Sequence, residues 1–160
     1  MRKDFAIAAT LSLLMMGWTN KATAQSASCT VSGVTPGRLA LAQNGKNDTL
    51  SARPDQSIGA QLGTFTLTCT DGLDISIMSP TAMAGTPTTE IQGMQLWEGV
   101  PGSGVLLTEK DSAGNGTGTA SLSAPITSRS LYIQMFAASP NKLLSVGTYT
   151  YHAVLTITPR

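Results

Sequence analysis

His152 is the side chain best suited to acid–base chemistry near neutral pH, because it is the only histidine of the chain. It lies within the run Thr148–Thr158, whose apolar and polar residues alternate as in a strand. The alternation places His152 on the face opposite Tyr151 and Ala153, toward solvent. No GxSxG or comparable motif frames a nucleophile for it. We therefore expect no enzymatic activity; a secreted enzyme with His152 as its base is a minor hypothesis.

Metal and phosphate sites have only weak support in the sequence. Asp71 and Asp74 lie near a turn, but they lack the regular spacing of oxygen ligands that calcium loops have. The glycine-rich stretch Gly114–Gly118 does not stand between a strand and a helix, as a phosphate-binding loop would. We interpret both as ordinary turns, and we expect neither a metal nor a cofactor.

The two cysteines, Cys29 and Cys69, are the strongest structural signal in the body of the chain. No CxxC pair is present, so a redox or metal-binding thiol lacks support. An even number of cysteines in an exported protein predicts a disulfide. A bond between Cys29 and Cys69 would close a loop of about 40 residues. Closing such a loop would stabilise the fold by about 4 kcal/mol in the chain-entropy model.

The amino terminus has the three parts of a secretory signal. Arg2 and Lys3 are basic, Phe5–Trp18 is almost wholly apolar or small, and Ala22–Ala24 is a small-x-small cleavage site. The apolar run is shorter than the roughly 20 residues of a membrane span, which disfavours an uncleaved anchor. We predict a signal peptide at residues 1–24 and one secreted domain at residues 25–160.

The charge of the predicted mature chain argues against nucleic acid as a partner. Residues 1–24 hold three of the ten basic and one of the nine acidic residues, so the remainder carries a net charge of −1. Binding to phosphate backbones needs an excess of Lys and Arg. Such an excess is missing here.

Short alternating segments separated by turns predict an all-β fold. In Leu62–Thr70 the residues Phe65, Leu67 and Cys69 share one face and threonines occupy the other. Asp71 and Gly72 end this segment, and Leu73–Met78 alternates again, which predicts a hairpin. Other strands are predicted at Cys29–Ser32, Arg38–Ala42, Met94–Glu98, Val105–Leu107, Leu131–Ala137 and Thr148–Thr158.

Loops are predicted at Ser79–Glu90 and at Asp111–Thr119, which are rich in Pro, Gly, Thr and Ala. No segment has helical periodicity with caps, so the expected architecture is a β-sandwich. Trp97 lies on the opposite side of its strand from Met94 and Leu96. We interpret it as a core residue, with sugar stacking as the alternative.

The C-terminal strand and the cysteines resemble the subunits of chaperone–usher pili. Counting from the C-terminus, Ile157, Leu155 and Ala153 are fourth, sixth and eighth, and Gly147 is fourteenth. In that family a glycine fourteen residues from the terminus precedes alternating apolar residues. Family members often have Cys-x-Val near the start of the first strand and a second cysteine about forty residues later. The matching residues here are Cys29-Thr-Val and Phe65-Thr-Leu-Thr-Cys, and the resemblance covers most of residues 29–160.

The resemblance implies an immunoglobulin-like sandwich that lacks its final strand. In such subunits a strand of a periplasmic chaperone fills the resulting groove. At the outer-membrane usher a strand of a neighbouring subunit then replaces the chaperone strand. This donor-strand exchange is a known example of β-strand addition. The residues that border the groove would be Tyr151, Ala153, Leu155 and Ile157, and the terminal carboxylate of Arg160 would meet basic residues of the chaperone. An ordinary inward face of a complete sandwich is the alternative.

Two features depart from the family pattern. Family members usually carry an aromatic residue second from the C-terminus, where this chain has Pro159, so pairing is expected to stop by Thr158. Polymerising subunits also have a donor extension before the first cysteine. Cleavage after Ala24 leaves only residues 25–28 there, which span at most roughly 14 Å.

We therefore predict a minor, tip-located fimbrial subunit at the cell surface, which accepts a strand and has a role in adhesion to a host or surface receptor. The alternative, from another class, is a self-contained secreted β-sandwich such as a spore-coat-like or carbohydrate-binding domain. That alternative predicts that the protein's own strand covers the apolar face of residues 149–157.

Overall fold

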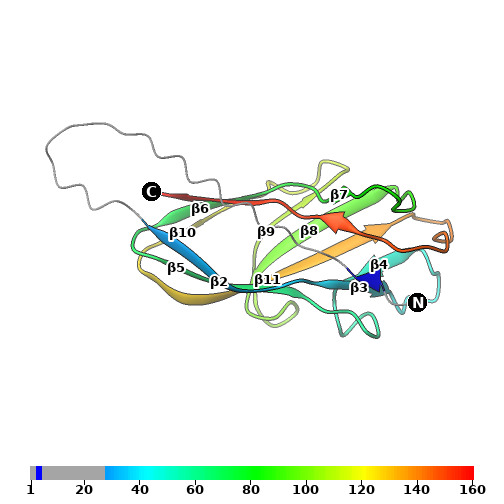
Figure 1. Cartoon of the computed structure of the whole chain (residues 1–160), viewed down its shortest axis with the longest axis horizontal. Helices are drawn as coiled ribbons and strands as arrows, with labels where there is room; N and C mark the ends of the chain where they lie inside the picture. The colour runs from blue at the N-terminus through cyan, green and yellow to red at the C-terminus, as the bar shows by residue number, and fades with distance from the viewer. Residues whose placement is uncertain (1–2, 5–27) are drawn as a thin grey trace, which may run out of the picture.

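The structure of the chain, a computed structural model, describes residues 3–4 and 28–160 and gives side-chain burial from residue 28 onward. The described residues form strands and turns without any helix, which confirms the all-β prediction. Figure 1 shows an elongated molecule whose strands run along its length. The predicted signal peptide lies outside the described residues, apart from Lys3 and Asp4.

The larger sheet has eight strands, arranged around the long strand β11. One edge of β11 pairs first with β5 and then with β4, and its other edge pairs with β8. β2 lies outside β5, β9 lies outside β8, and β3 and β1 follow β4. The bounds are β1 Lys3–Asp4, β2 Cys29–Thr35, β3 Arg38–Leu41, β4 Thr49–Ser51, β5 Gly63–Cys69, β8 Ile91–Glu98, β9 Val105–Asp111 and β11 Ile126–Ala138.

Two smaller sheets complete the described fold. The first has three strands in the order β10–β6–β13, and the second pairs β12 with β7. Their bounds are β6 Leu73–Ile77, β7 Thr81–Ala82, β10 Thr119–Leu122, β12 Tyr151–His152 and β13 Leu155–Pro159. Several sheets that enclose one core are compatible with a β-sandwich.

The core lies where the alternating strands of the different sheets turn their apolar faces inward. On β5 the side chains of Phe65, Leu67 and Cys69 are buried, as predicted, and the threonines between them are more exposed. On β6 the inward residues Leu73 and Ile75 are fully buried. Each such side chain contributes roughly 1.5–3 kcal/mol of transfer free energy. The strand β11 adds further buried residues from the larger sheet, among them Leu131, Ile133 and Met135.

The predicted hairpin between β5 and β6 is wrong. β5 pairs with β2 and β11, whereas β6 pairs with β10 and β13. The turn at Asp71 and Gly72 carries the chain from one sheet to the other. Both strands bury one complete apolar face, and placing them in different sheets lets those two faces enclose the same core.

The predicted disulfide is confirmed, since Cys29 is bonded to Cys69. These two residues also face each other in the pairing of β2 with β5. The bond therefore fastens the first residue of an edge strand to the last residue of its neighbour.

The strand predicted at residues 148–158 is divided in two. Tyr151 and His152 pair with β7, whereas β13 pairs with β6. The division follows from the partner, because β6 ends at Ile77 and β7 begins only at Thr81, with Pro80 between them. A proline cannot donate to a ladder. One backbone hydrogen bond, from Met78 to Val154, crosses this break.

Candidate functional site: the free edge of the C-terminal strand

The C-terminal strand β13 has a partner on only one of its two edges within the described residues. It pairs antiparallel with β6, with Leu155 opposite Ile77 and Pro159 opposite Leu73. No other described strand pairs with it. Figure 1 shows this segment in red along one side of the molecule, beside β6.

The backbone of β13 shows which of its groups point to the open edge. The carbonyl of Val154 accepts from Met78 at 3.2 Å, and the amide of Arg160 donates to Gly72 at 2.8 Å, so both residues are directed at the β6 side. Residues along a strand alternate in the edge to which their N–H and C=O groups point. The groups of Leu155 and Ile157 therefore point to the open edge.

Pro159 belongs to this strand, so the expectation that pairing stops by Thr158 is wrong. The strand reaches Pro159, and Arg160 continues the ladder beyond it. The reason is the same alternation: the nitrogen of Pro159 faces the open edge, where no ladder bond is lost. Proline within sheets is confined to such edge positions. Its presence here agrees with β13 being an edge strand.

The four apolar residues predicted to border the groove all point into the core. Tyr151 and Ala153 are completely or almost completely buried, and Leu155 and Ile157 are each 8% exposed. The hydroxyl of Tyr151 shares a buried hydrogen bond of 2.9 Å with Thr89 Oγ1. Burial raises the pKa of Tyr151, and this hydrogen bond opposes the rise. Their contact with a donor strand or a chaperone stays a prediction.

The side chain of Arg160 is held against the end of the smaller sheet. Its Nε lies 3.4 Å from a carboxylate oxygen of Asp74, and its Nη2 donates to the carbonyl of Leu122 at 3.3 Å. Together with the bond from its amide to Gly72, these contacts fix the last residue on the strand. The chain end therefore has a defined position next to the open edge.

Gly147 lies in the turn before β12 and β13. A Cβ added to it would lie 2.6 Å from Cγ of Pro87, which is closer than side chains approach one another. The loop that carries Pro87 therefore packs directly on the backbone of Gly147. This contact gives a physical reason for glycine at the fourteenth position from the C-terminus.

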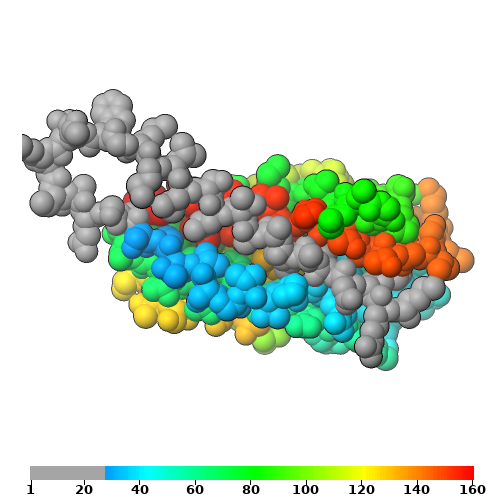
Figure 2. Space-filling view, viewed as in Figure 1, coloured from blue at the N-terminus to red at the C-terminus, as the bar shows by residue number. Residues whose placement is uncertain are grey.

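The other sheet also has an open edge on the same face of the molecule. β2 pairs with β5 and with no other described strand. Figure 2 shows β2 in blue and the C-terminal segment in red on the face turned to the viewer. The free edges of β2 and β13 thus belong to different sheets and lie on one face.

The remaining residues singled out in the sequence are not brought together. His152 is exposed on β12, as predicted. Asp74 accepts a hydrogen bond from Ser121 and contacts Arg160. Residues 28–160 contain no group of three or more His, Cys, Asp or Glu side chains placed to hold a metal ion. In the same part of the chain no helix is long and apolar enough to cross a membrane.

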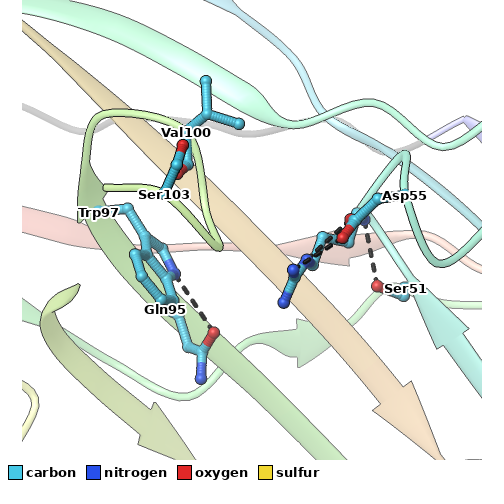
Figure 3. Close-up of polar contacts among 7 residues, drawn as sticks. Ser51, Asp55, Gln95, Trp97, Val100 and Ser103 are labelled. Carbon is cyan, nitrogen blue, oxygen red and sulfur yellow. Dashed lines mark hydrogen bonds and ion pairs between the residues drawn. The ribbon is translucent and has the colours of Figure 1, made fainter. Parts of the chain in front are cut away.

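The prediction that Trp97 is a core residue is wrong. Met94 and Leu96 on β8 are fully buried, but Trp97 points to the other side of the sheet and is partly exposed. Figure 3 shows its indole nitrogen directed at the side chain of Gln95. The period-two pattern of β8 already placed Trp97 opposite the apolar residues, and this signal outweighs the general tendency of tryptophan to be buried.

Models of known protein families do not match this sequence, and a search of curated proteins finds no match either.

Proposed function

We propose that residues 25–160 form a subunit of a chaperone–usher pilus that accepts a β-strand from a partner. The observation that carries this proposal is the open edge of β13, along which the N–H and C=O groups of Leu155 and Ile157 have no described partner strand. An exposed edge of this kind is a template for strand addition and a liability if it stays open. Pro159 on the same edge supports this assignment.

The finer fold that belongs to this proposal is an immunoglobulin-like sandwich without its final strand. It is supported by the arrangement of the strands, because β2, β5, β11 and β8 are neighbours in one sheet and β6 and β13 in another. A strand added beside β13 would extend the smaller sheet. The added strand would cover the edge that β13 leaves open.

The partners in this proposal are a periplasmic chaperone, an outer-membrane usher and a neighbouring subunit. The chaperone lends the first strand, and its basic residues hold the terminal carboxylate of Arg160. Fixation of Arg160 by Gly72 and Asp74 supports this role, since it presents the chain end at a constant place. The protein would not be an enzyme, and it would pass through the periplasm to the cell surface.

The position at the tip of the fibre rests on the length of chain before Cys29. Cleavage after Ala24 would leave residues 25–28 as the only segment ahead of the disulfide. Such a segment is too short to fill a neighbour's groove. The subunit would then receive a strand without donating one, and a role in adhesion follows from that place.

The test adds a strand to the open edge. The chain with its own signal is produced in a bacterial periplasm either unchanged or with a C-terminal Asn-Gly turn and an alternating Val/Thr strand that runs back beside Tyr151. Asn-Gly favours a two-residue hairpin, which makes the added strand antiparallel to β13. We expect the extended chain to be a soluble monomer with a higher Tm, and the unchanged chain to aggregate.

The matched control carries the same extension with proline at the positions that would bond to β13. It keeps the length and most apolar residues but cannot form the ladder, so it should behave as the unchanged chain does. A stable monomer from the unchanged chain, with a Tm that the extension does not alter, would refute the proposal.

The second candidate is a self-contained secreted β-sandwich. It is favoured by one observation, the low exposure of Leu155 and Ile157, which are each 8% exposed. Amide hydrogen exchange on the folded chain separates the two candidates. An open edge predicts fast exchange at Leu155 and Ile157 between slow exchange at Thr156 and Thr158, whereas a covered edge predicts slow exchange at all four.

A further inference from the structure

The outer face of the larger sheet, opposite the core, carries aromatic and polar side chains in a continuous strip over β9, β8 and β11. Trp97 on β8 is opposite Tyr132 on β11, and Gly93 on β8 is opposite Phe136. From Gly93 to Trp97 the strip runs for roughly 13 Å along the strand. That length would accommodate a short chain of linked sugar rings.

Phe136 reaches from β11 across β8. A Cβ added to Gly93 would overlap ring atoms of Phe136, so the ring lies directly over the Gly93 backbone. Beyond it a small, shallow pocket of about 50 Å³ is lined by Phe136, Met94, Glu109, Lys110, Asp111 and Asn115. The strip therefore has an aromatic ring at each end and a pocket beside one of them.

The polar groups between the rings are already oriented by one another. Trp97 Nε1 donates to Gln95 Oε1 at 3.3 Å, and Gln95 Nε2 donates to Glu109 Oε2 at 2.9 Å. Asn115 donates twice to Asp111, at 2.8 and 2.7 Å, and these bonds lower the pKa of that carboxyl. Both carboxylates retain lone pairs that can accept from hydroxyl groups.

A further acceptor on the same face has unmet hydrogen-bonding capacity. Gln134 lies between Tyr132 and Phe136 on β11 and is only 7% exposed. Its Oε1 is buried and makes no hydrogen bond within the described part of the chain. An unpaired buried acceptor costs free energy, but neighbouring atoms cover this oxygen, so it is not counted among the groups that would contact a ligand.

The turn between β8 and β9 lies at the Trp97 end of the strip. Arg53 forms two hydrogen bonds with Asp55, at 2.8 and 2.7 Å (Figure 3). A Cβ on Gly102 would lie 2.7 Å from Arg53 Nη2, so the tip of the turn rests on the guanidinium. The β8–β9 turn follows the strand that carries Trp97, and its tip is thus held in place against Arg53.

The charges of the strip indicate which ligands it can accept. Asp55 neutralises Arg53. Lys110, whose Nζ donates to the carbonyls of Gly116 and Gly114 at 3.0 and 3.4 Å, keeps its charge and offsets one of the two carboxylates Glu109 and Asp111. The remaining negative charge disfavours sialylated or sulfated ligands. Flat aromatic faces beside oriented acceptors suit ligands with apolar C–H faces and many hydroxyl groups.

We propose that this strip is a binding site for a neutral oligosaccharide, with Trp97 as the stacking platform, Gln95 and Glu109 as hydroxyl-binding groups, and the Phe136 pocket as a second subsite. The strip lies on a different sheet from the open edge of β13. Binding here is therefore independent of strand addition, and each can fail without the other.

The test uses the fluorescence of Trp97, which is the only tryptophan in residues 25–160. The folded chain, with or without the added C-terminal strand, is titrated with neutral oligosaccharides of galactose, glucose, mannose and N-acetylated hexosamines, and with sialylated forms of the same. We expect at least one neutral oligosaccharide to shift the emission of Trp97 and its sialylated form to bind more weakly. The same panel on a printed array measures binding by variants that lack Trp97.

Trp97→Ala should weaken array binding about tenfold or more, as loss of an aromatic anchor does. Gln95→Ala and Glu109→Gln keep the fluorophore and should each weaken binding severalfold. Leu143→Ala, at a side chain 75% exposed in the loop after β11 and not part of the strip, is the matched control and should bind as the parent does. Two results would overturn the proposal. The first is that no neutral oligosaccharide of the panel binds at millimolar concentration, and the second is that Gln95→Ala binds as tightly as the parent. Neither result bears on the strand-addition test.

Discussion

Gly93→Ala offers a sharp test of how the outer face of β8 is packed. The added methyl would overlap the ring of Phe136, and the ring must move because the methyl is attached to a backbone held on both sides by β9 and β11. Overpacking of this kind costs roughly 1–3 kcal/mol. For a domain of this size the loss corresponds to a fall in Tm of roughly 4–12 °C.

The double variant with Phe136→Ala isolates the cause. Once the ring is gone the methyl has room, and alanine is then favoured over glycine in a strand by roughly 0.5–1 kcal/mol. Gly93→Ala should therefore destabilise the parent but not the Phe136→Ala variant. The assay is equilibrium urea unfolding of all four proteins, followed by circular dichroism.

Gly85→Ala supplies the control for this cycle. Gly85 has φ of 83° and nothing within 4 Å of an added Cβ, so alanine there strains only the backbone. Its cost should be the same with and without Phe136. If Gly93→Ala and Phe136→Ala are also additive within about 0.5 kcal/mol, the ring does not lie over Gly93 and the reasoning fails.

Three further predictions concern the rest of the molecule. Replacing Cys29 and Cys69 together by serine should lower the free energy of unfolding by about 4 kcal/mol in urea titrations, because the bond spans 40 residues; a loss under about 1 kcal/mol would contradict this. Burial raises the pKa of Tyr151 above 10.0, so the folded chain holds this proton more tightly than the unfolded one. The contribution of this proton to the free energy of unfolding should be fully present below that pH and lost as the pH rises above it. Denaturant unfolding at a series of alkaline pH values measures this loss, which Tyr151→Phe should lessen. His152→Ala should change the unfolding free energy by less than about 0.5 kcal/mol, since the side chain is exposed; a larger loss would place it in a structural contact.

The all-β class and the inward faces of β5 and β6 were predictable because each strand buries one complete face. Period-two alternation reports that burial directly, as at Phe65 and Leu67. The disulfide was predictable as well, since residues 28–160 contain one pair of cysteines, and they are bonded. These signals depend only on neighbouring residues or on residue type.

The pairing of strands was less predictable, because it depends on residues far apart in the sequence. Nothing local to Asp71 and Gly72 distinguishes a hairpin turn from a crossing between sheets. β10 was missed because Thr119–Leu122 has only one buried apolar residue. The break after His152 depends on where β6 and β7 end.

The sequence could predict which side chains of the candidate site point into the core. It could not predict which backbone groups face the open edge. The inward faces of Tyr151 and Ile157 follow from alternation. The inclusion of Pro159 could not be read from the sequence, because the edge that its nitrogen faces depends on the register with β6. Gln95 and Glu109 were missed, since their contact joins two strands.

The Cys29–Cys69 bond has a mechanical consequence. A pulling force applied to the chain ahead of Cys29 reaches Cys69 through a covalent bond, at the end of β5. β5 lies between β2 and β11, so the load is delivered in shear to the interior of the sheet instead of peeling the edge strand away one hydrogen bond at a time. The amino-terminal end of this domain is thus held by an interior strand of the sheet and not by the edge strand alone.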